Sequence, residues 1–155
     1  MSKLIEKIVT GGQTGVDRAA MDVAIELGIP YSGWCPKGRL AEDGILSNEY
    51  NLKETPTSEY SERTEWNARD SDGTFVLNFG ELSGGTKLTE ECAFKYKKPY
   101  ILLQAEDELA LESIVGWVKD NKIKILNIAG PRESHQPGIV YSLSKKLLKT
   151  ILTNI

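Results

Sequence analysis

The sequence predicts an α/β fold of the Rossmann-like, doubly wound type, with a mainly parallel sheet of about five strands and helices on both faces. Short β-rich runs alternate about five times with amphipathic helical stretches, which requires crossover connections between parallel strands. The strand-like runs are apolar on both faces, as expected for strands that helices cover on both sides. Because the chain has 155 residues and no visible repeat or linker, we expect residues 1–155 to form a single domain.

The first half of the chain opens with a strand, a helix and a second strand. Ile5–Thr10 is a short apolar run that ends in two glycines and is predicted to be a strand. Apolar residues at helical spacing predict a helix over Val16–Leu27, which Gly28 ends as a left-handed cap. Ile29–Trp34 is the second predicted strand, and Cys35–Tyr50 is a charged loop without a clear period.

A short extended piece and a third amphipathic segment follow. Asn51–Ser58 contains the extended piece, which Pro56 limits to a sheet edge or a turn. Tyr60–Asp70 is predicted to be a helix, with Ser58 or Ser61 as its N-cap.

Strands and helices alternate regularly through the rest of the chain. We expect strands over Gly73–Phe79, Tyr100–Leu103 and Lys124–Ala129. We expect helices over Ser83–Lys97, Asp107–Asn121 and Ile139–Leu152. In sheets of this kind ligands bind beyond the carboxyl ends of the strands, near the switch in strand order.

Composition and charge exclude several classes of protein. Hydrophobic residues make up 40% and charged residues 26%, and the net charge of −3 argues against a general binder of duplex nucleic acid. No apolar run approaches the roughly 20 residues of a membrane helix. Two cysteines are too few for a disulfide scaffold, and the first residues do not resemble a signal peptide. We therefore expect a cytoplasmic protein with no membrane partner.

Three polar, glycine-rich turns follow predicted strands: Gly11–Arg18, Ser83–Thr89 and Gly130–Ser134. Glycines let the backbone approach a ligand closely, and the first N–H groups of a helix bind anions. Each turn taken alone could instead be a tight connection or an N-cap without a ligand. At one edge of a parallel sheet, the three together predict a phosphate-bearing ligand. The candidate residues are Gly11, Gly12, Gln13, Thr14, Gly15, Arg18, Gly84, Gly85, Thr86, Thr89, Gly130, Arg132 and Ser134.

Basic residues gather near the same predicted edge. Lys37, Gly38 and Arg39 follow the second strand, and with Arg18 and Arg132 they suggest a local cation cluster for an anionic partner. The alternative is a set of separately solvated basic side chains.

Side chains from the Tyr60–Asp70 helix and the second strand are further candidates. Arg63 and Asn67 lie four residues apart, on one helix face, and either face the ligand or make ordinary surface pairs. Trp34 is the best candidate for stacking. The catalytic inventory is poor, because the one histidine, His135, has no nucleophile elbow beside it and no metal-ligand spacing is present.

Five motifs in chain order resemble the molybdenum cofactor carrier family. The resemblance implies a circularly permuted Rossmann-like fold, related to the lysine-decarboxylase-like phosphoribohydrolases. It also implies a homo-oligomer, either a dimer or a tetramer, that binds an anionic pterin or nucleotide-like ligand at the glycine turns. The motifs are Gly11–Asp22, Gly33–Arg39, Arg63–Asn67, Gly84–Thr86 and Ala129–Ser134.

The function that this resemblance implies is a carrier of the molybdenum cofactor, molybdopterin with its phosphate and metal, that serves molybdoenzymes. The alternative is a nucleoside-monophosphate phosphoribohydrolase. In that family's motif Gly84 and Gly85 match the glycine pair and Glu91 matches the glutamate, which would act as general acid or base. Ser83, Lys87 and Leu88 depart from the motif. A third possibility is a nucleotide-sensing module without turnover.

Overall fold

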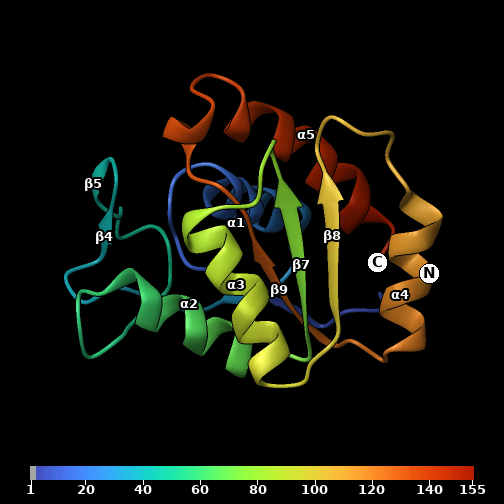
Figure 1. Ribbon diagram of the computed structural model, residues 1–155, viewed down its shortest axis with the longest axis horizontal. Coiled ribbons are helices and arrows are strands. Elements are labelled where there is room, and N and C mark those ends of the chain that lie inside the picture. The colour runs from blue at the N-terminus through green and yellow to red at the C-terminus, as the bar shows by residue number, and fades with distance from the viewer. Residues whose placement is uncertain (1–2) are drawn as a thin grey trace.

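A parallel sheet of five strands forms the centre of the computed structural model, which describes residues 3–155 (Figure 1). Its strand order is β2-β1-β9-β7-β8, and every neighbouring pair is parallel. The prediction of a mainly parallel sheet of about five strands is confirmed. The strands are β1 (Lys7–Val9), β2 (Tyr31–Ser32), β7 (Gly73–Asn78), β8 (Tyr100–Gln104) and β9 (Ile125–Ala129).

Helices cover both faces of this sheet, as predicted. Helices α1 and α5 pack against each other, and α4 contributes to the same apolar cluster. Helices α2 and α3 pack together over the other face, where Figure 1 shows α3 crossing in front of β7. The helices are α1 (Val16–Leu27), α2 (Tyr60–Arg69), α3 (Gly84–Lys95), α4 (Leu111–Asp120), α5 (Val140–Thr153) and the 3-10 turn η1 (Glu133–His135).

The two faces of the central strands differ in polarity, contrary to the expectation that both are apolar. On the side of α1 and α5, Phe75, Leu77 and Ile128 belong to the main core. Successive residues of a strand point to opposite faces, so Thr74 and Asn127 belong to the α2–α3 side, where the Asn127 Nδ2 donates to the Thr74 hydroxyl over 3.2 Å. The polar face forms the floor of a cavity.

Four two-residue strands lie where the sequence showed mainly a loop. Strands β3 (Trp34–Cys35) and β6 (Lys53–Glu54) form a parallel pair, so the extended piece expected within residues 51–58 is present. Strands β4 (Leu40–Ala41) and β5 (Gly44–Ile45) form an antiparallel hairpin, which extends from the body of the molecule in Figure 1. Two residues are too few to show a strand period, which is why the sequence did not reveal them.

Two details of the predicted helices were wrong. The N-cap of α2 is Glu59, in extended backbone and without a side-chain cap, rather than Ser58 or Ser61. The helix expected from Asp107 begins at Leu111. Within residues 3–155, no helix is both long and apolar enough to cross a membrane.

Candidate functional site

A cavity of about 330 Å³ lies beyond the carboxyl ends of β7 and β9. The strand order reverses between these two strands, because the chain goes from β7 outward to β8 and then returns to place β9 on the other side of β7. A ligand is expected at such a switch point. The three glycine turns meet here, and the predicted residues that line the cavity are Gly11, Gln13, Arg63, Asn67, Gly84, Gly85, Thr86, Thr89, Gly130, Arg132 and Ser134.

The turn that begins α3 is open to this cavity. The first backbone hydrogen bond of the helix runs from Lys87 N–H to the Ser83 carbonyl over 3.2 Å, so the preceding N–H groups of Gly84, Gly85 and Thr86 have no intrahelical partner. A Cβ placed on Gly84 or Gly85 would meet nothing within 4 Å. Packing therefore explains neither glycine. The positive φ of +55° accounts for Gly84, whereas at Gly85 neither packing nor a positive φ requires a glycine, and an approaching anion would use its N–H group.

The turn that begins α1 is crowded by the protein itself. A Cβ on Gly11 would lie 2.4 Å from Arg63 Nη1, and one on Gly15 would lie 2.4 Å from the Pro131 carbonyl oxygen. The Gln13 N–H already donates to the Asp17 carboxylate over 3.3 Å. These glycines are needed for close packing of three chain segments, whether or not a ligand binds.

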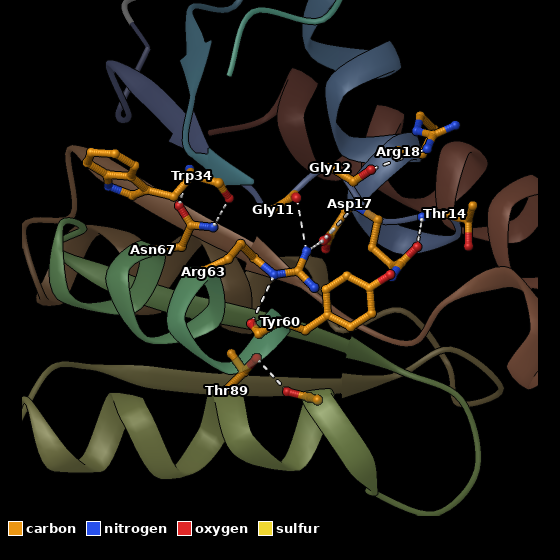
Figure 2. A network of polar contacts seen from close by, with 12 residues as sticks. Gly11, Gly12, Thr14, Asp17, Arg18, Trp34, Tyr60, Arg63, Asn67 and Thr89 are labelled. Carbon is orange, nitrogen blue, oxygen red and sulfur yellow. Dashed lines mark hydrogen bonds and ion pairs between the residues drawn. The ribbon is translucent and has the colours of Figure 1, made fainter. Parts of the chain in front are cut away.

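A buried ion pair joins α1 and α2 at the edge of the cavity. Figure 2 shows Arg63 reaching from α2 to Gly11 and Asp17, where its Nη1 donates to the Gly11 carbonyl over 2.9 Å and lies 3.5 Å from the carboxylate. Burial raises the pKa of Asp17 against the opposing effect of Arg63, and burial lowers the pKa of Arg63. Asp17 was not predicted, because its partner lies 46 residues away in sequence.

Two guanidinium groups approach the ring of Tyr60 at the cavity. Arg63 lies 5.2 Å and Arg132 lies 5.4 Å from its centroid. The side chain of Arg63 is 9% exposed and that of Arg132 is 43% exposed. Arg132 therefore supplies positive charge at the solvent side, and Tyr60, which the sequence did not single out, supports both cations.

The floor of the cavity carries two amide side chains that sequence reasoning missed. Asn78 ends β7 and Asn127 lies in β9, and both are buried and line the cavity. Asn78 Nδ2 donates to the Gly80 carbonyl over 2.9 Å. An asparagine within an otherwise apolar strand was the signal that could have found them.

Asn67 and Trp34 serve a structural junction. The Asn67 side chain accepts from the Trp34 N–H over 2.8 Å and donates to its carbonyl over 3.0 Å (Figure 2). The Trp34 indole donates to Asp70 over 2.8 Å and meets Trp66 edge-on, with ring centroids 4.8 Å apart. Trp34 is not among the residues that line the cavity, whereas Asn67 is, although both the oxygen and the nitrogen of its side chain are used to join α2 to β3.

Most of the expected cation cluster lies elsewhere. Arg18 binds Asp43 through two contacts of 3.0 and 3.1 Å, and also donates to the Gly12 carbonyl over 3.3 Å. Lys37 is exposed, and the Gly38 N–H donates to Glu54 over 2.7 Å. Arg39 donates to the carbonyls of Leu46, Ser47, Tyr50 and Leu52.

The candidate catalytic residues lie in different positions relative to the cavity. Glu91 is exposed and is not among the residues that line the cavity, whereas Asp17 and Glu81 are. A ring nitrogen of His135 lies 2.5 Å from the Phe79 carbonyl oxygen. No group of three or more His, Cys, Asp or Glu that could hold a metal occurs in residues 3–155.

Comparisons with known proteins agree with this architecture. The circularly permutated YpsA SLOG family model matches residues 8–152. The crystal structure of a protein from Syntrophus aciditrophicus SB, named "Putative molybdenum carrier protein", is 47% identical, with a TM-score of 0.90 over 98% of each chain. No curated protein matches the chain significantly.

The strand order explains why the fold is a permuted one. Counted from β7, the order β8-β7-β9-β1-β2 becomes the 2-1-3-4-5 order of flavodoxin-like doubly wound sheets. A permuted chain needs its two ends to be adjacent, and here the Ile5 N–H donates to the Ile155 carbonyl over 2.9 Å. The chain belongs to the circularly permutated YpsA SLOG family.

Proposed function

We propose that this protein is a carrier that holds a phosphate-bearing small molecule in the cavity beyond β7 and β9. The observation that carries the proposal is the open turn at Gly84 and Gly85, two residues that line the cavity and whose N–H groups have no intrahelical partner at the start of a helix. The positive end of the α3 dipole would stabilise a phosphate there.

The charges and donors around the cavity support an anionic ligand. Arg132 is the more exposed of the two guanidinium groups that line it, and since its nearest carboxylate, that of Glu42, lies 4.0 Å away, it can still make a charge-assisted contact with a ligand. Gln13 is only 5% exposed, and its Nε2 has no partner within residues 3–155. A buried donor without an acceptor is costly, so a ligand acceptor at this place would stabilise the complex.

The ligand we propose is the molybdenum cofactor. The similar protein from Syntrophus aciditrophicus SB is named a putative molybdenum carrier. The cavity of about 330 Å³ is within the range of about 300–1,000 Å³ for small-molecule sites. The phosphate would bind at α3, and the polar pterin would face Asn78 and Asn127.

Delivery of the ligand defines the expected partners. A carrier of this kind would transfer its ligand to a molybdoenzyme, and we propose that it acts as a homo-dimer or tetramer. Phosphoribohydrolase chemistry is less well supported, because Glu91, its proposed acid or base, does not line the cavity.

The test compares two glycines that both meet open space. Gly85→Val would block the start of α3, and Gly116→Val makes the same change in α4, where a Cβ also meets nothing within 4 Å. We expect Gly85→Val to weaken molybdopterin binding at least about tenfold, since its side chain would keep the phosphate away from the N–H groups and so prevent charge-assisted hydrogen bonds. Gly116→Val should bind like the wild type.

Calorimetry with molybdopterin under anaerobic conditions measures both affinities. Failure of the wild type to bind at micromolar concentration would remove the cofactor proposal. Incubation with a panel of nucleoside monophosphates, with chromatography for the free base, tests the enzyme alternative. Release of free base that is lost when Glu91 is substituted would show that the protein is a hydrolase rather than a carrier.

A further inference from the structure

The turn of the β4–β5 hairpin inserts a carboxylate into a ready-made set of donors. Glu42 accepts hydrogen bonds from the Thr14 hydroxyl over 2.5 Å, the Ser134 N–H over 3.0 Å and the Ser134 hydroxyl over 2.6 Å. Arg132 Nη1 lies 4.0 Å from the same carboxylate. Hydroxyls, a backbone N–H and a guanidinium are the groups that bind phosphate in proteins.

The second residue of the turn repeats this pattern. Asp43 receives two contacts, of 3.0 and 3.1 Å, from Arg18. A two-pronged guanidinium contact is also the geometry with which arginine binds phosphate. Both acids of the turn therefore occupy groups that the sequence predicted for a ligand.

The residue that Glu42 contacts, Ser134, belongs to two cavities. Ser134 lines the cavity beyond β7 and β9 and also a second one of about 770 Å³, which Glu42, Thr14 and Arg18 line as well. Rotation of the Glu42 side chain away from Ser134 would open one cavity to the other. A ligand larger than the first cavity could then extend past Glu42 into the second cavity.

The unsatisfied donor of Gln13 lies next to the Glu42 contact. Gln13 Oε1 accepts from the Thr14 N–H over 3.0 Å and from the Glu42 N–H over 2.8 Å. Its Nε2 is buried without a partner in residues 3–155, while the residue lines the first cavity. The unpaired Nε2 points to a missing acceptor in the first cavity, next to the Glu42 contact, because buried amide donors are normally paired.

The base of the hairpin is firmly held, so the change can be confined to the turn. Arg39 donates to four backbone carbonyls of the following loop, at distances from 2.7 to 3.3 Å. The side chains of Glu42 and Asp43 can rotate without displacement of the strands.

We infer that Thr14, Arg18, Arg132 and Ser134 form a second anion subsite, which the Glu42 and Asp43 carboxylates occupy in the free protein. A ligand with two anionic groups displaces them. This inference rests on the first part of the proposed function, a phosphate-bearing ligand at the start of α3, and not on molybdopterin, which carries a single phosphate. The ligand class is a small molecule with two phosphates or a diphosphate ester.

The test counts inorganic phosphate ions. Glu42→Gln keeps the size of the side chain and removes its charge, and Glu49→Gln removes the same charge from an exposed side chain nearby. Calorimetry should show one more phosphate bound by Glu42→Gln than by the wild type or Glu49→Gln. The added site should bind about tenfold more tightly than any second phosphate in the wild type, which corresponds to about 1.4 kcal/mol.

A second variant locates the added site. Ser134→Ala in the Glu42→Gln background removes a donor hydroxyl and should abolish the gain. If the wild type binds no phosphate and Glu42→Gln binds one, the second subsite is supported and the proposed site at α3 is overturned. If both proteins bind one phosphate, the inference is overturned and the proposed function stands.

Wild-type protein supplies a measurement that does not depend on variant folding. Titration with inorganic pyrophosphate should shift the Ser134 and Glu42 amide signals in nitrogen–proton NMR spectra, since Glu42 leaves the Ser134 N–H. Unchanged signals at saturating pyrophosphate would overturn the inference.

Discussion

Two glycine-rich turns, one before α1 and one before α3, have the same kind of sequence and opposite surroundings. At the first, Cβ atoms on Gly11 and Gly15 would each lie 2.4 Å from another heavy atom. At the second, Cβ atoms on Gly84 and Gly85 would meet nothing within 4 Å. A glycine turn therefore indicates a ligand only where the space of the missing side chain is left open.

The donors of the two turns differ in the same way. At the first turn, the Thr14 hydroxyl donates to Glu42 and the Gln13 N–H donates to Asp17. At the second, the first N–H groups of α3 face a cavity. The first turn holds the fold together and carries a protein carboxylate, while the second is available to an external anion.

Gly15→Ala tests the crowded turn and should have the largest effect. The backbone of Gly15, with φ +79° and ψ −126°, lies in a region essentially open to glycine only and costs an alanine about 1–3 kcal/mol, and overpacking against Pro131 adds about 1–3 kcal/mol. Urea denaturation should therefore show a loss of about 2–6 kcal/mol in the free energy of unfolding.

Gly28→Ala is the control for that change. Gly28 also has a positive φ, of +70°, but with ψ 27° it lies in the left-handed helical region, and its Cβ would meet nothing within 4 Å. It should lose only the backbone part, about 1–2 kcal/mol. Equal losses in the two variants would show that the turn before α1 is not crowded.

Gly85→Ala tests the open turn and should move stability in the other direction. Alanine is a better helix former than glycine by up to about 1 kcal/mol, and no atom is displaced. We expect the urea midpoint to stay constant or rise slightly while phosphate affinity falls. A loss of stability as large as that of Gly15→Ala would remove the contrast between the two turns.

The main elements of the fold could be predicted because their signals are local. Apolar runs such as Gly73–Phe79 and helical spacing over Val16–Leu27 depend on neighbouring residues only. Strands β3 and β6 depend on pairing with a segment 19 residues away, and the β4–β5 hairpin has only two residues in each strand, so the sequence did not reveal them.

The candidate site could be predicted in part for the same reason. The three turns meet, as parallel strand ends dictate. The sequence could not predict which basic side chains line the cavity, because each one's position depends on the residues that it contacts in the folded protein. Arg18 is neutralised by Asp43, and Arg39 binds backbone carbonyls. The pairing of Asp17 with Arg63 connects residues that no local pattern relates.

The smallest effect concerns the carboxylate that occupies the first turn. Burial alone would raise the pKa of Glu42, but hydrogen bonds from Ser134 and Thr14 outweigh it and lower the pKa below its usual 4.5. A carboxyl with a lowered folded pKa stabilises the protein above the unfolded pKa, and the contribution is lost as the pH falls through the folded value. Glu42→Gln should therefore unfold more easily than the wild type at neutral pH, by about 0.5 kcal/mol after allowance for solvent screening.

The pH dependence of this difference tests its origin. Urea denaturation from pH 7 to pH 3 should show the wild-type advantage disappear below about pH 4, because protonated Glu42 no longer gains from its charge-assisted bonds. Glu49→Gln, which removes a charge from an exposed side chain, should follow the wild type throughout. A difference that persists unchanged at pH 3 would mean that shape rather than charge holds Glu42, and the turn before α1 would then have no anion subsite to reveal.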